Sequence, residues 1–258
     1  MPLMKTANPA LGITTFETMP GSQPDVEFTG DVDLSKRMTL SGTVNKTGLL
    51  LVLAVGPAAW VWRLFFAGAT LQTMGIALGA GAVGGFIVAL VTVFKKQWSP
   101  LTAPLYALLE GLVLGAGSAV VESRFPGIAI QAVILTFGTL FVLLLAYATR
   151  IIRVTQKFQL GVIAATGGVI IFYMVDLVLH HYVMDPFNAS GPYGMIISVV
   201  ISAIAALNLV LDFDFIEQGV KVGAPKYMEW YGAFGIIVTL FWLYLEVLHL
   251  LTLLRGRD

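Results

Sequence analysis

Two acidic side chains lie inside long apolar runs of this sequence, and their types and positions indicate proton or cation chemistry. Asp212 lies near the end of a long apolar run, in LNLVLDFDFIE, and Glu246 lies within TLFWLYLEVLHLL. A charged carboxylate near the core of a bilayer is costly, so acids in membrane spans usually face the protein interior and are functional. Two carboxyl groups that meet in a low dielectric cannot both ionise cheaply, so they share a proton. The two residues therefore predict a proton-sensing and gating pair.

Helical periodicity distinguishes Asp212 from the neighbouring acid Asp214. The positions four and seven residues before Asp212 share its helix face, and they are Asn208 and Ala205, one polar and one small. The same positions before Asp214 hold Val and Leu. We therefore expect Asp212 to face the protein interior, and Asp214 to be an interfacial charge that reaches headgroups or water.

Glu246 also belongs to a helical stripe of small and polar residues, unlike the Leu, Phe and Trp around it. Hard oxygen ligands suit calcium, so we expect transient calcium binding at Asp212 and Glu246 and no other cofactor. A third intramembrane acid, Glu110, follows Tyr106 by one helical turn. Besides the acid pair, three residues are candidates for a cation path: Glu110, Asn208 and Asp214.

The composition limits the fold class to an all-α integral membrane protein. Of the 258 residues, 57% are hydrophobic and 12% charged, and the apolar runs repeatedly reach the roughly 20 residues that a spanning helix needs. Cysteine is absent, which excludes disulfides, thiol catalysis and cysteine metal sites. The first 37 residues hold no long apolar segment, so we expect a flexible cytosolic tail at 1–37 and a transmembrane domain at 38–258.

The apolar runs predict a bundle of seven transmembrane helices. The expected spans cover about residues 48–66, 70–94, 102–122, 127–149, 160–179, 193–215 and 229–254.

The basic residues predict the orientation, because cytoplasmic loops carry an excess of Lys and Arg. With seven spans, eleven of the 15 basic residues fall in the tail and alternate connections. We therefore expect a multi-pass protein of the bacterial inner membrane, with its amino terminus in the cytosol and its carboxyl terminus outside.

The sequence lacks residues that retinal proteins and intramembrane proteases require. A retinal protein needs a lysine inside the last span for a Schiff base, and the last span has none. A rhomboid-like protease needs a GxSG loop with a histidine partner, and GAGSA has the wrong order. An aspartyl protease fits the residue types without its GxGD signature, and stays a third hypothesis. Metal catalysis is also poorly supported, because two of the three histidines are adjacent and therefore point to different helix faces. We expect no enzyme activity.

Three segments resemble the Bax inhibitor-1 family of transmembrane Bax inhibitor motif proteins, in its bacterial branch: LYALLEGLVLGAGS, LVLDFDFIE and LYLEVLHLL. The resemblance covers residues 38–254. It implies seven helices with the last one central, and a pH-sensitive calcium leak in which acids matching Asp212 and Glu246 share a proton. A basic residue that latches the sixth-helix acid in that family falls near Lys95 or Lys96.

Two features separate this chain from the family pattern. The seventh-helix acid is usually Asp rather than Glu, and the stretch KVGAPKYMEWYGAFG reads as an insertion between the acids. The depths also conflict: by helical rise, Asp212 falls near the cytosolic end of its span and Glu246 near the outer end. A direct pair would then require tilt, a broken helix or an extended seventh helix.

Two main functions follow as hypotheses. The first is a proton-gated calcium leak, with calcium and protons as permeant or regulatory ions and the lipid bilayer as surroundings. The alternative is a non-conducting scaffold that binds a membrane quality-control protease, motivated by the tail. Nothing suggests nucleic-acid binding, and the oligomeric state stays open.

Overall fold

The computed structural model describes residues 37–182 and 192–256, except the side chains of 177–182 and 192. This part of the chain contains seven helices that are long and apolar enough to cross a membrane, which confirms the predicted fold class. In chain order they are α2 (Leu40–Phe66), α3 (Leu71–Phe94), α4 (Ser99–Arg124), α5 (Ile128–Ala148), α6 (Gln156–Tyr182), α7 (Pro192–Lys221) and α8 (Met228–Arg255), with a short 3-10 helix at Lys96–Trp98.

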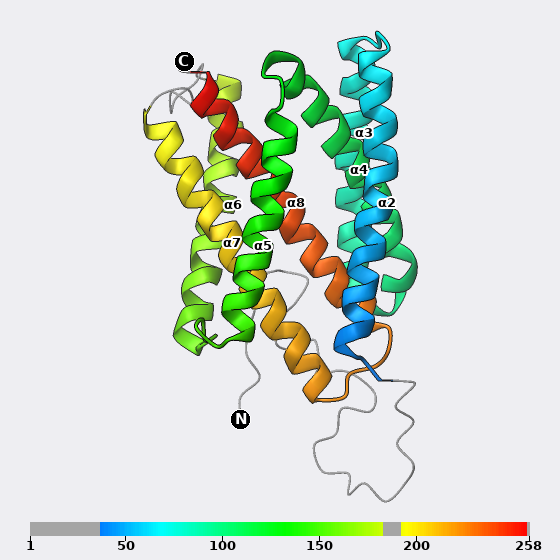
Figure 1. Cartoon of the computed structure of the whole chain (residues 1–258), viewed down its shortest axis with the longest axis vertical. Helices are drawn as coiled ribbons and strands as arrows, with labels where there is room; N and C mark the ends of the chain where they lie inside the picture. The colour runs from blue at the N-terminus through cyan, green and yellow to red at the C-terminus, as the bar shows by residue number, and fades with distance from the viewer. Residues whose placement is uncertain (1–36, 183–191, 257–258) are drawn as a thin grey trace, which may run out of the picture.

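Threonine side chains cap the starts of the first two helices. The side chains of Thr39 and Thr70 cap α2 and α3 by accepting hydrogen bonds from the backbone N–H groups of Gly42 and Thr73, as N-cap threonines commonly do. The connections that the structure describes are short, and successive helices alternate in direction (Figure 1).

Helix α8 is the centre of the bundle. It packs against α2, α4, α5 and α7, and it crosses the molecule obliquely between them (Figure 1). Half of its most apolar stretch is buried, against 17% for α2 and α3. Its buried side chains include Tyr231, Phe234, Ile237, Leu240 and Leu243. The position expected for the seventh span is therefore the one observed.

Helix α7 extends further than its apolar run indicates, and α8 begins soon after it. Helix α7 continues to Lys221 because Glu217 and Lys221 form an ion pair of 2.5 Å one turn apart, which supports a helix beyond its apolar part. Gly223 then turns the chain with a φ of +66°, and α8 starts at Met228. Of the stretch expected to be an insertion, residues 222–227 form a short turn between the two helices, and residues 228–235 are the first turns of α8.

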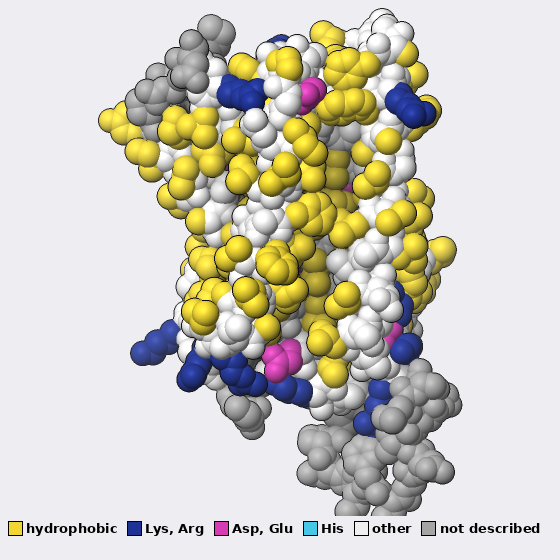
Figure 2. Space-filling model, viewed as in Figure 1, with side chains coloured by type: hydrophobic (Ala, Val, Ile, Leu, Met, Phe, Trp, Pro, Cys, Tyr) yellow, Lys and Arg dark blue, Asp and Glu magenta, His cyan; other side chains and the backbone are white. Residues whose placement is uncertain are grey.

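The starts of α2, α4, α6 and α8 lie at the same end of the bundle as the ends of α3, α5 and α7 (Figure 1). Many Lys and Arg side chains gather at this end on the face shown in Figure 2. We call it the basic end, and the other one the outer end.

Candidate functional site

Helix α6 presents a polar side chain every seven residues. Gln159, Thr166 and Tyr173 are separated by two helical turns each, so they line one face, and Gln159 and Thr166 are buried. Each of the three bonds to a side chain of the α7–α8 pair. This face of α6 forms one side of the candidate site.

The three contacts are specific hydrogen bonds. The Gln159 amide donates to Asp214 Oδ2 at 3.5 Å. The Asn208 amide donates to Thr166 Oγ1 at 2.8 Å, and the Tyr173 hydroxyl donates to Glu246 Oε1. We call these contacts the polar seam; its six residues are Gln159, Thr166, Tyr173, Asn208, Asp214 and Glu246.

Asp212 and Asn208 face the interior, as their helix face predicts. Asp212 is 0% and Asn208 2% exposed, and Asn208 also donates to the backbone carbonyl of Ile204 at 2.9 Å. A buried acid has to be hydrogen-bonded, paired or protonated to be tolerated. Asp212 lies one turn from Asn208 and two residues from Asp214, so it belongs to the same part of the bundle.

The interfacial position expected for Asp214 is wrong. Its side chain is 8% exposed, and the Tyr147 hydroxyl of α5 donates to it at 3.3 Å. The prediction fails because α7 is buried on every side at this level: all residues from 208 to 216 are buried. A rule that assigns one face to lipid does not apply to such a segment. Glu217, one turn further, also accepts a hydrogen bond from Tyr147.

The antiparallel packing of α7 and α8 places Asp212 and Glu246 at different depths. Asp212 lies nine residues before the end of α7, and Glu246 lies 18 residues after the start of α8. The difference of nine residues corresponds to about 14 Å along the bundle. Glu246 is bonded by Tyr173 instead. This register agrees with the depth conflict noted in the sequence, and the direct pair of Asp212 and Glu246 stays a prediction.

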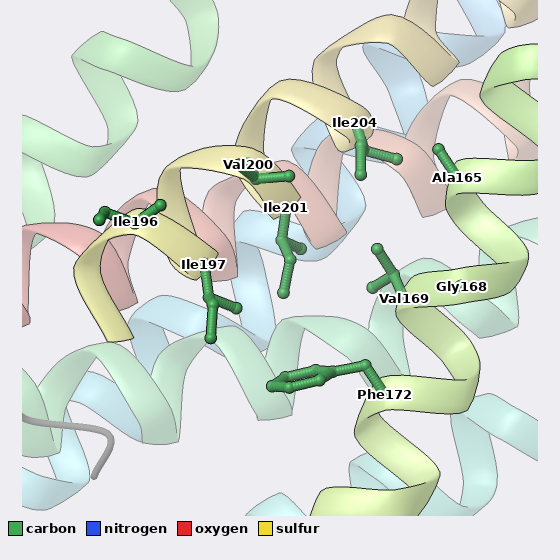
Figure 3. Close-up of a pocket in the computed structure, with 9 residues that line it drawn as sticks. All are labelled: Ala165, Gly168, Val169, Phe172, Ile196, Ile197, Val200, Ile201 and Ile204. Carbon is green, nitrogen blue, oxygen red and sulfur yellow. The ribbon is translucent and has the colours of Figure 1, made fainter. Parts of the chain in front are cut away.

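An apolar segment interrupts the polar seam. Between the Thr166–Asn208 and Tyr173–Glu246 contacts, a cavity of about 280 Å³ separates α6 from α7. The side chains of Val169, Phe172 and Ile201 extend into this space (Figure 3). The contact between α6 and α7 is therefore apolar between these two hydrogen bonds.

Glu110 lies in a different interface from the polar seam. Its carboxylate approaches Gly85 of α3, where an added Cβ would lie 3.2 Å from Oε1. Tyr106, one turn earlier on α4, interacts with the same carboxylate. Gly85 leaves room for this carboxyl group between α3 and α4. Its expected contribution to a cation path with Asp212 is therefore not supported.

The two candidate latch residues have different surroundings. Lys95 is exposed, whereas the Lys96 ammonium lies 5.9 Å from the ring centre of Tyr231, within the range of a cation–π contact. Tyr231 in turn packs against Phe215 of α7, three residues after Asp212. Lys96 is thus the better latch candidate, through Tyr231.

Glu229 is a buried acid that the sequence analysis did not single out. Its side chain is 0% exposed. It accepts hydrogen bonds from the Thr39 N–H at 2.8 Å and the Thr39 hydroxyl at 2.7 Å, and forms ion pairs with Lys46 and, at 2.9 Å, Lys226. The first turn of α8 favours a negative charge as well. Glu229 therefore fastens the start of α2 to the start of α8.

The described residues contain no group of three or more His, Cys, Asp or Glu side chains that could hold a metal ion. Calcium binding at Asp212 and Glu246 stays a prediction, with the two residues offset by about 14 Å along their helices. Any calcium bound along the seam would be held by few protein oxygens at a time.

Comparison with known proteins identifies a family for this chain. The family model described as "Bax inhibitor 1 like" matches residues 8–256. The match covers the whole membrane region and also much of the first 37 residues, which the resemblance seen in the sequence left outside. No match was found among curated proteins or among solved structures.

Proposed function

Because the chain belongs to the Bax inhibitor 1-like family, we propose that it is a proton-sensitive cation leak that favours calcium and has no enzymatic activity. The observation that carries the proposal is the polar seam. Polar side chains inside a membrane bundle are costly and usually mark an ion or proton path. Here three of them on α6 meet three on α7 and α8 in successive layers.

The proposed path enters at the basic end beside Asp214 and Glu217 and passes Asp212 and Asn208. It continues between α6 and α7 to Glu246 near the outer end. Carboxylate and amide oxygens suit a hard cation such as calcium. Conduction requires α6 to move away from α7, because the space between these helices is lined by apolar side chains, Val169, Phe172 and Ile201 among them.

Asp212 supplies the proton sensitivity in this proposal. A carboxyl group with no solvent exposure is much cheaper to bury when it is protonated. Loss of the proton puts a negative charge among buried side chains, which favours an arrangement that admits water and cations. Flux should therefore be low at acidic pH and rise as the pH increases. Glu246, held by Tyr173, is a second and separate carboxyl site.

The test is calcium flux into liposomes that contain the purified full-length protein, across about pH 5 to 8. Wild type should conduct more at the alkaline end. Asp212→Asn, which cannot ionise, should abolish the pH dependence. Glu110→Gln is the matched control, because it removes a carboxyl group from the α3–α4 interface. Equal flux in wild type and Asp212→Asn at every pH would contradict the proposal.

The scaffold function remains an alternative prediction. It was motivated by residues 1–37, nearly all of which lie outside the described residues. Deleting them and measuring both flux and co-purifying membrane proteins separates the two functions. Unchanged flux with loss of a partner protease would favour the scaffold.

A further inference from the structure

A lateral groove runs between α2 and α5 on the outer half of the bundle. Its cavity of about 530 Å³ lies within the range of roughly 300–1,000 Å³ typical of small-molecule sites. Helices α4 and α8 form its floor, and apolar side chains line the hollow visible between α2 and α5 (Figure 2). Because the groove lies between two outer helices, it opens toward the lipid chains.

The outer end of the groove is polar. Arg63 lies there, three residues before the end of α2, and has no ion-pair partner among the residues that the structure describes. The hydroxyls of Ser118 and Tyr244 lie 2.7 Å apart and also line the groove. The remainder of the lining is almost entirely apolar.

The register of α2 and α4 places these polar groups at successive depths. Gly111 and Gly115 meet the backbone carbonyls of Ala54 and Ala58, so residues of α4 lie level with residues of α2 that are 57 lower in number (111−54 and 115−58). Ser118 is therefore level with position 61, about 3 Å deeper than Arg63.

The length of the groove matches one leaflet. It extends along α2 from Arg63 to Leu51, and the twelve residue steps between them rise about 18 Å. One leaflet is about half of the ~30 Å hydrocarbon core. From the outer end inward, the groove presents a charged side chain, then a hydroxyl pair, then an apolar part of this length. A phospholipid has its phosphate, ester and acyl chain in the same order.

We propose that this groove binds one acyl chain of an anionic phospholipid from the leaflet at the outer end. The Arg63 guanidinium bonds the phosphate in a forked geometry, and the Ser118–Tyr244 hydroxyl pair donates to an ester oxygen. The acyl chain lies along α5 and α8 down to Leu51 and Leu240. This site is separate from the polar seam and does not depend on the proposed leak.

The acyl-chain part is tested with full-length protein in liposomes that contain a trace of phosphatidylglycerol carrying a photoreactive group in its acyl chain. Mass spectrometry then locates the cross-links. We expect them on the groove-facing residues of α2, α5 and α8, and a several-fold decrease in Val133→Trp, which fills the groove. The control is Val142→Trp on the lipid-facing surface of the same helix.

A second measurement does not depend on the folding of the tryptophan variant. On wild type, unlabelled phosphatidylglycerol should compete with the probe more strongly than phosphatidylcholine or a free fatty acid does. Arg63→Gln should remove that preference, while Arg124→Gln, an exposed arginine at the same end, should keep it. Cross-links spread evenly over all lipid-facing surfaces, or equal competition by the three lipids, would overturn the proposal.

Discussion

The Tyr173 hydroxyl of α6 donates a hydrogen bond to the Glu246 carboxylate of α8. This contact is the outermost layer of the polar seam. It gives Glu246, which is 6% exposed, a partner from a helix that must move if the seam opens. The contact therefore connects burial of an acid with the packing of α6 against α8.

Replacement of Tyr173 by Phe should loosen the outer part of the seam. Glu246 would lose its donor while staying buried, at a cost of about 1–3 kcal/mol, so thermal stability in detergent should fall and resting calcium flux should rise. Tyr193→Phe is the control, because Tyr193 is 74% exposed. Unchanged stability and flux in Tyr173→Phe would show that the contact does not hold the seam closed.

Replacement of Lys46 by Gln should be clearly destabilising. Lys46 is 18% exposed and pairs with the fully buried Glu229, so its loss should cost about 1–3 kcal/mol. Lys221→Gln removes a lysine that is 56% exposed and paired on the surface, which should cost at most about 1 kcal/mol. Thermal unfolding of both variants side by side measures the difference. Equal shifts would mean that the Glu229 contacts do not fasten α2 to α8.

The two adjacent lysines after α3 should behave differently. Lys96→Ala removes the contact with Tyr231 and should change the pH dependence of calcium flux, because Tyr231 packs on α7 near Asp212. Lys95→Ala removes an exposed lysine and should leave the flux unchanged. If both variants behave as wild type, neither lysine acts as a latch.

The absence of cysteine allows a clean test of orientation. A single cysteine at Val222, in the turn between α7 and α8, should react with membrane-impermeant reagents only from the cytosol. One at Ala67, after α2, should react only from outside. The reverse pattern would show that the basic end does not face the cytosol.

Much of the fold was predictable because it depends on segment length and polarity, which are local properties. The seven spans follow from apolar runs, and the interior position of Asp212 from its neighbours one and two turns away. Asp214 was misassigned because its burial is caused by Tyr147 and Gln159 from two other helices. Glu229 was missed because its partners Thr39 and Lys46 are about 190 residues away in sequence. The seven-residue spacing of polar side chains on α6 was visible and would have indicated the seam.

The central claim is that cations pass between α6 and α7, and a cross-linking experiment tests it most directly. Cysteines at Val169 and Ile201, which line the same cavity from facing helices, can be joined by a short reducible thiol cross-linker. Calcium flux at alkaline pH should then be lost, and reduction should restore it. A pair at Ala77 and Leu112, which pack in the same cluster between α3 and α4, should conduct normally when joined. Full flux through protein joined at Val169 and Ile201 would contradict a path along the polar seam.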